Sequence, residues 1–65
     1  MFLVYKNRFN EVKAYSVEAI ASDENYLDVR DLEAGSIKTF KHENILSEER
    51  SLESAQLKAE LLQPN

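Results

Sequence analysis

The chain has no cysteine, a single histidine, a single glycine and a single proline. Without cysteine it can form neither a disulfide framework nor a thiolate metal site, and a reducing compartment suits it. A zinc site would need more nitrogen or sulfur ligands than this sequence offers. We therefore predict a cytoplasmic protein with no metal and no cofactor.

A basic field and a long apolar run are also missing. Eight Lys and Arg stand against twelve Asp and Glu, for a net charge of −4. Strong non-specific nucleic-acid binding is built from many phosphate contacts, so this charge balance argues against it. A local patch of basic residues is still compatible with the composition. The apolar run from Phe2 to Tyr5 is too short for a signal-peptide core or a membrane span. We expect neither secretion nor a membrane segment.

No catalytic constellation is recognisable. His42 would need a nucleophile or a second carboxylate in a defined place, and no motif supplies one, so we predict that the protein is not an enzyme. A group of acidic residues recurs around the third predicted strand but lacks the spacing and glycine of a calcium loop. We interpret these residues as a solvated edge that discourages aggregation: Asp23, Glu24, Asp28, Asp31 and Glu33.

What the sequence does contain is the balance of a globular domain, with 43% apolar and 31% charged residues. Its 65 residues leave room for one domain, whose core stabilises the fold by only a few kcal/mol. Alternating β-prone segments separated by polar turns predict four strands. They are expected at Phe2 to Tyr5, Val12 to Ala21, Tyr26 to Leu32 and Ile37 to Lys41, with Ile45-Leu46 closing this portion.

Two local features refine the strand prediction. Asn10 suits a turn position with positive φ in the first hairpin. In the second strand Tyr15 and Val17 alternate on one face, whereas Ile20 has the other parity, and a bulge near Glu18-Ala19 would bring all three to one core. The core we predict comprises Phe2 or Leu3, Val4, Tyr15, Val17, Ile20, Leu27, Val29, Phe40, Ile45 and one stripe of a C-terminal helix.

From Ser47 the composition changes to good helix formers, and we expect a helix from about Ser47 to Gln63, capped by Ser47 or Ser51. One stripe, formed by Leu52, Ala55, Ala59 and Leu62, would cover the sheet. Leu57 and Leu61 lie nearly opposite. They either hold a second subunit or a host protein or are simply exposed, as apolar residues on terminal helices often are.

These elements predict an α+β fold: a small four-stranded, mostly antiparallel, bent sheet or partly open barrel with one C-terminal helix. The strand-rich part covers residues 1–46. The helical part covers residues 47–65 and belongs to the same single domain.

Three stretches of the strand-rich part carry a resemblance to a known family. The first is an opening hairpin, Tyr5-Lys6-Asn7 followed by Glu11-Val12-Lys13 and Val17. The second is the triplet Asn25-Tyr26-Leu27. The third runs from Lys38 to Ile45 and reads Lys-Thr-Phe-Lys-His-Glu-Asn-Ile. In order and spacing they resemble the WYL domain, a small SH3-like or Sm-like β-barrel of bacterial regulators named for a tryptophan-tyrosine-leucine triplet.

The resemblance covers about residues 4 to 46 and includes departures from the family pattern. Asn25 replaces the tryptophan, Asn10 replaces a glycine, and a proline expected after Val17 is absent. Lysines replace two arginines of the last segment, at positions 38 and 41, and Asn44 replaces a third. Family members sit behind a DNA-binding helix-turn-helix and are implicated in sensing nucleotides or single-stranded nucleic acid. The resemblance implies a degenerate, stand-alone sensor-type barrel whose output domain is missing or supplied by another protein.

Two functional hypotheses follow. The first is a regulatory or accessory module that binds an anionic ligand, a nucleotide or single-stranded nucleic acid, with Tyr5 or Tyr15 stacking a base. Alternatively, the lysines are solvated strand positions paired with acids such as Glu33 or Glu43, and the tyrosines are core. The second hypothesis is a protein-interaction or homo-oligomerisation domain that uses Leu57 and Leu61 or a sheet edge. The ligand-binding residues predicted under the first are Arg8, Lys13, Lys38, Lys41 and His42.

Overall fold

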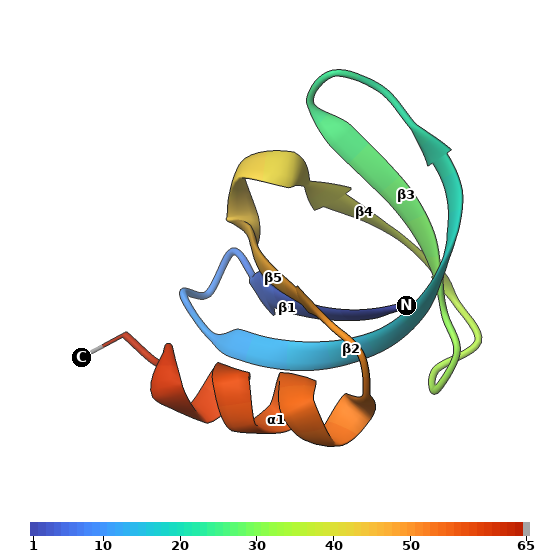
Figure 1. Cartoon of the computed structure of the whole chain (residues 1–65). Coiled ribbons are helices and arrows are strands. Elements are labelled where there is room, and N and C mark those ends of the chain that lie inside the picture. Colours follow the sequence, from blue (N-terminus) through green and yellow to red (C-terminus); the bar gives the residue numbers. More distant parts are fainter. Residues whose placement is uncertain (65) are drawn as a thin grey trace.

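The computed structural model describes residues 1–64, which form one antiparallel sheet and one C-terminal helix (Figure 1). The sheet has five strands in the order β4-β3-β2-β1-β5. The predicted α+β class is confirmed, but the predicted number of four strands is wrong. The elements are β1 (Phe2–Lys6), β2 (Val12–Ser22), β3 (Tyr26–Asp31), β4 (Ile37–Lys41), the 3-10 turn η1 (His42–Asn44), β5 (Ile45–Glu49) and α1 (Leu52–Leu61).

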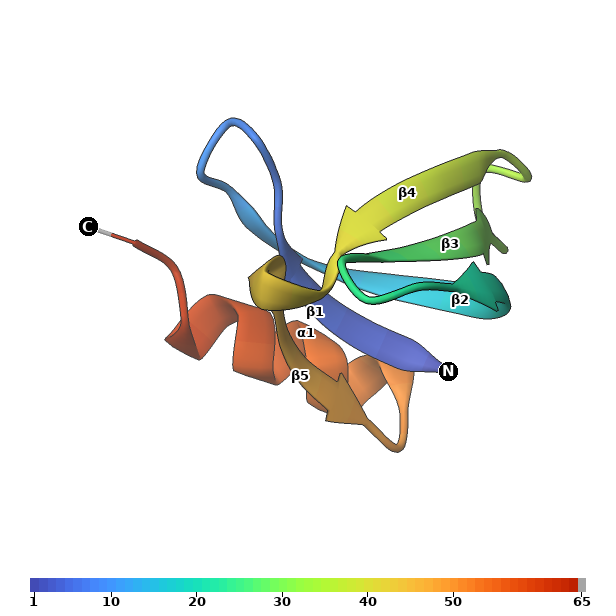
Figure 2. The same cartoon turned by 90° about the horizontal axis from the view of Figure 1, so that it is seen from above.

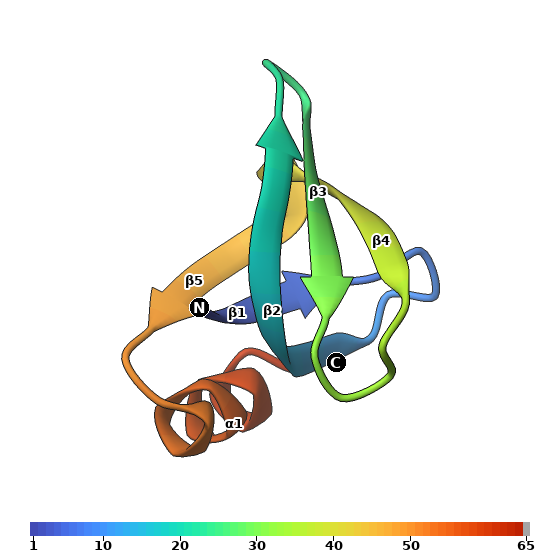
Figure 3. The same cartoon turned by 90° about the vertical axis from the view of Figure 1, so that its right-hand side faces the viewer.

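The sheet is strongly curved, yet within residues 1–64 it does not close into a barrel, because β4 and β5 remain its two edges (Figures 1 and 3). β2 is the longest strand, with 11 residues. Its first half pairs with β1, from Lys6↔Val12 to Phe2↔Ser16, and its second half pairs with β3, from Val17↔Asp31 onward. A single bent strand therefore joins the two halves of the sheet.

The turn between β1 and β2 has the predicted geometry. Asn10 has φ of 64°, a conformation that asparagine tolerates better than most residues. The Asn7 side chain accepts hydrogen bonds from the amides of Phe9 (2.9 Å) and Glu11 (3.1 Å), so this loop is held by its own first residue.

The bulge in β2 lies close to the predicted place but has the opposite effect on Ile20. The β2–β3 register passes from Ala19↔Val29 to Ala21↔Asp28, so Ile20 is the extra residue. A bulge leaves its extra residue unpaired in the ladder. Here Ile20 is 48% exposed, and its predicted place in the core is wrong.

Two apolar clusters lie on opposite faces of the sheet. The concave face holds Leu3, Tyr5, Val17, Val29 and Phe40, with Tyr15, Leu27 and Ile45 packed against them. The other face holds Val4, Val12, Ala55 and Ala59, with Phe2 and Ala14 alongside, beneath α1. Apart from Ile20, the predicted core residues from the strands belong to one of these clusters, and Tyr5, Val12 and Ala14 were not among the predicted core residues.

The helix begins later than predicted. Ser47 to Glu49 belong to β5, because their backbone pairs with β1 from Val4↔Ser47 to Phe2↔Glu49, and tertiary pairing prevails over helix propensity. Ser51 is the N-cap and accepts from the Ser54 amide at 3.1 Å, as one of the two predicted caps. Asn65, the end of the predicted helical part, lies outside the described residues.

α1 lies across β1, β2 and β5 (Figure 2). Ala55 and Ala59 are buried against the sheet, as predicted, whereas Leu52 and Leu62, predicted on the same stripe, are each 38% exposed. The Gln63 side-chain amide donates to the carbonyls of Val12 and Ala59 and ties the end of the helix to β2. In the part of the chain described, α1 is too short and too polar to cross a bilayer.

Candidate functional site

A groove lies between the β1–β2 turn and β4 on the concave side of the sheet. Its volume is about 490 Å³, and it combines aromatic rings with two cationic side chains. Aromatic faces and cations together suit a flat, anionic ligand. The residues that line the groove are Tyr5, Asn7, Arg8, Phe9, Tyr15, Lys38, Thr39 and Phe40.

The floor of the groove is a compact aromatic cluster. The Tyr5 and Phe40 rings stack with centroids 3.9 Å apart and planes 14° apart. Tyr15 meets both edge-on, at 6.3 Å from Tyr5 and 5.2 Å from Phe40. The Tyr5 hydroxyl also accepts a hydrogen bond from the Lys41 amide at 3.1 Å. Tyr5 and Phe40 are buried, so Tyr5, one of the two tyrosines expected to stack a base, is part of the core. Of these three rings, only that of Tyr15 is partly exposed.

Phe9 is the groove residue that sequence reasoning missed. It stands at the tip of the β1–β2 turn and is 68% exposed, the most exposed aromatic side chain among the described residues. The Arg8 guanidinium lies 4.9 Å from the centre of its ring. The signal that could have indicated Phe9 is its place as an aromatic residue within a polar turn, Asn7-Arg8-Phe9-Asn10, because turns lie on the surface and often carry function.

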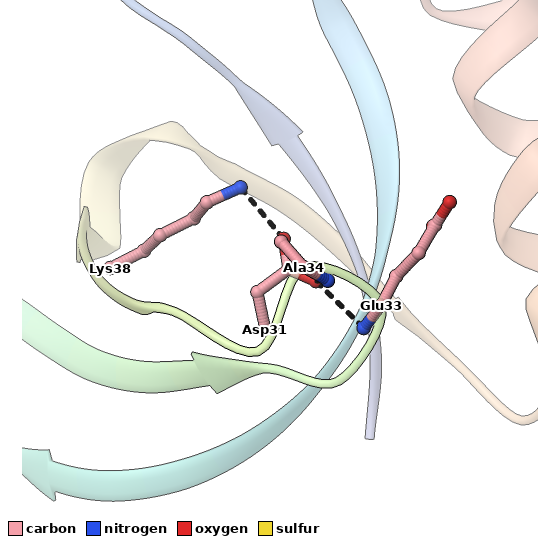
Figure 4. A network of polar contacts seen from close by, with 4 residues as sticks. All are labelled: Asp31, Glu33, Ala34 and Lys38. Atoms are coloured by element: carbon pink, nitrogen blue, oxygen red, sulfur yellow. Dashed lines mark hydrogen bonds and ion pairs between the residues drawn. The ribbon is translucent and has the colours of Figure 1, made fainter.

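Lys38 lies in the groove wall, and its charge is compensated (Figure 4). Its ammonium nitrogen is 2.7 Å from a carboxylate oxygen of Asp31 and 5.1 Å from the centre of the Tyr15 ring. The alternative in which Lys38 pairs with an acid is confirmed, but the partner is Asp31 rather than Glu33 or Glu43. Lys38 thus keeps its place through two contacts within the protein itself.

Asp31 is buried, with 5% of its surface exposed, so its assignment to a solvated edge is wrong. Its other oxygen accepts from the amides of Glu33 and Ala34, both at 3.0 Å, which fixes the turn after β3 (Figure 4). The bond from Lys38 is the largest influence and, with these amides, lowers the pKa of the Asp31 carboxyl below its ordinary value of 3.8. The same bond raises the pKa of Lys38. Both groups are charged near neutral pH.

The structure does not gather the predicted cationic residues into one patch. Lys38 and Lys41 are three positions apart on β4, and successive side chains of a strand point to opposite faces, so Lys41 lies away from the groove. Lys41 and His42 line a separate hollow, together with Glu24, Asn25, Tyr26 and Glu43. Lys13 pairs across from Tyr5 and is exposed, but it is not among the residues that line the groove. Of the predicted set, only Arg8 and Lys38 line the groove, whereas Lys41 and His42 share the separate hollow.

His42 has a local structural role. Its Nε2 lies 3.0 Å from the Ser22 hydroxyl and 3.1 Å from the Asp23 carbonyl oxygen, and so connects η1 to the β2–β3 turn. Residues 1–64 contain no group of three or more histidine or acidic side chains close enough to hold a metal ion.

The predicted interface residues are on the solvent side of α1. Leu57 is 58% exposed and Leu61 is 80% exposed. They lie four positions apart and therefore on one face of the helix, away from Ala55 and Ala59.

Comparison with known proteins gave no match to a protein-family model, a curated protein or a solved structure. The WYL resemblance therefore remains a prediction from the three sequence motifs.

Proposed function

We propose that the protein is a non-enzymatic accessory or regulatory module that binds a nucleotide or a short stretch of single-stranded nucleic acid in the groove between the β1–β2 turn and β4. The observation that carries the proposal is that Arg8, Phe9 and Tyr15 line one groove. Every nucleobase presents a flat π face to such rings, and guanidinium groups recognise phosphate.

The net charge of the chain limits the affinity expected for nucleic acid. With a net charge of −4, the protein attracts nucleic acid only at a local cationic site. The affinity is accordingly modest, with few phosphates neutralised and a shallow salt dependence. The WYL resemblance points to the same class of ligand, although the groove uses Arg8 and Phe9, which none of the three motifs includes.

A titration with a short oligothymidine, followed by amide NMR at low and physiological salt, tests the proposal. We expect shifts of the amides of Arg8, Phe9, Tyr15 and Lys38 that salt reverses. Phe9→Ala should weaken binding by about 1 to 3 kcal/mol, the usual contribution of one stacked base. Because Phe9 is exposed, this change should leave the fold intact.

Leu57→Ala is the matched control, since it truncates a similarly exposed apolar side chain on α1. It should leave the affinity unchanged. Shifts confined to the hollow around Lys41 and His42, or equal effects of the two variants, would contradict binding in the groove.

The second candidate function is self-association through the exposed face of α1, favoured by Leu57 and Leu61. It ranks lower because two leucines supply little of the area of about 800 Å² per partner that stable interfaces bury. Sedimentation at increasing protein concentration tests it. A mass that rises with concentration in the native chain but not in a Leu57→Gln, Leu61→Gln variant would support it.

A further inference from the structure

The two cations of the groove differ in their surroundings. Within residues 1–64, Arg8 forms no ion pair, and the carboxylate on its own turn, Glu11, accepts instead from the Asn7 side chain at 3.5 Å. Lys38, in contrast, is bonded to Asp31 at 2.7 Å. The groove therefore has a positive end at Arg8 and Phe9 and a neutralised end at Lys38 and Tyr15.

At the neutralised end, the carboxylate that compensates Lys38 is fixed in place. Asp31 is buried and is anchored by the Glu33 and Ala34 amides, so its carboxylate cannot move away when an anion approaches. Lys38, whose side chain is 38% exposed, can still reach solvent and a ligand. An anionic group placed beside Lys38 would lie close to the fixed carboxylate, and the repulsion between them offsets the attraction of the ammonium.

We propose that Asp31 is a specificity-determining residue of the groove: by compensating Lys38 it leaves one effective anion site, at the Arg8 end, beside a place for a flat uncharged group at Tyr15, so that a second anionic group adds no affinity. This inference rests on the proposed function and adds the orientation of the ligand in the groove. A nucleoside monophosphate matches this pattern, with its phosphate at Arg8 and its base along the rings of Phe9 and Tyr15. A second phosphate at the Lys38 end contributes little.

The test compares thymidine 5′-monophosphate with thymidine 3′,5′-bisphosphate by amide NMR titration of the full chain. In the native protein we expect nearly equal affinities. Asp31→Asn keeps an acceptor for the Glu33 and Ala34 amides but removes the charge beside Lys38. In this variant the bisphosphate should bind about two- to five-fold more tightly than the monophosphate, the range of one exposed ion pair.

The double variant Asp31→Asn, Lys38→Gln is the matched control and should lose this preference. An equal affinity for the two ligands in Asp31→Asn, or a preference for the bisphosphate already present in the native protein, would overturn the inference while leaving the groove function intact. Failure of the native protein to bind either nucleotide would instead refute the proposed function and the inference with it.

Single variants keep the inference testable should Asp31→Asn fold poorly. Arg8→Gln should abolish most binding of the monophosphate, because it removes the positive end of the groove. Lys38→Gln should lower that affinity much less, because Lys38 lies at the other end of the groove from the phosphate bound at Arg8. A larger loss of monophosphate affinity from Lys38→Gln than from Arg8→Gln would contradict the placement of the phosphate at the Arg8 end.

Discussion

The two halves of the curved sheet are stabilised differently. The half formed by β1, β5 and the first part of β2 is covered by α1, which buries Ala55 and Ala59 against Val4 and Val12. The half formed by β3, β4 and the end of β2 depends on polar side chains that fix its turns, above all Asp31. The comparison shows that the covered half provides apolar packing beneath α1 and carries Arg8 on its β1–β2 turn, whereas the polar half supplies Lys38 and the carboxylate that compensates it.

Between the two halves lies the concave aromatic cluster, where we expect a substitution to cause the largest loss of stability. Phe40→Ala removes a buried ring that stacks on Tyr5 and should cost about 3 to 5 kcal/mol of unfolding free energy. This is enough to unfold a domain of this size, and thermal denaturation would measure it. Ile37→Ala, an exposed position on the same strand, is the control, and an equal effect of the two changes would contradict the core assignment.

The covered half can be disturbed by itself. Ala55 is fully buried between α1 and the sheet, so Ala55→Leu should force the helix outward at a cost of about 1 to 3 kcal/mol. Chemical denaturation would report the loss, and Gln56→Leu, on the exposed side of the same turn, should be nearly neutral. A stable Ala55→Leu variant would mean that the contact between helix and sheet is looser than the structure indicates.

The polar half should depend on pH. The pKa of Asp31 is lowered on folding, so its contribution to stability is full well above the unfolded value of about 3.8 and is lost as pH falls through the folded value. Asp31→Asn should therefore lose about 1 kcal/mol near neutral pH, and the difference from the native chain should shrink under acid conditions. Denaturation curves at several pH values would measure this, and a difference independent of pH would exclude the ionic contribution.

Much of the fold could be predicted because local patterns determine it. Asn10 supplies a positive φ, and alternating residues such as Val17 and Val29 face the core as their parity predicts. The predicted helix began too early, inside the fifth strand, because Ser47 to Glu49 carry no β signal of their own. Their extended form comes from pairing with β1, which is distant in sequence.

The candidate site was predicted only in part, for similar reasons. Arg8 and Lys38 were identified by type, and the groove brings them together. Lys41 was grouped with them although its parity on the strand places it on the other face. The burial of Asp31 could not be read from the acidic cluster around it, because that burial depends on how the turn after β3 folds back on Lys38.

The hydrogen bond between the Tyr5 hydroxyl and the Lys41 amide has a consequence for how the sheet can move. It connects β1 to β4, two strands that are not neighbours in the sheet, across the concave face, where no ladder of backbone bonds joins them. A ladder would fix the separation of the strands by several bonds, whereas a phenol does so through one. The curvature of the sheet, and with it the width of the groove, is therefore held on this side by side chains: by this hydrogen bond, which is worth about 1 kcal/mol, and by the stacked rings of Tyr5 and Phe40.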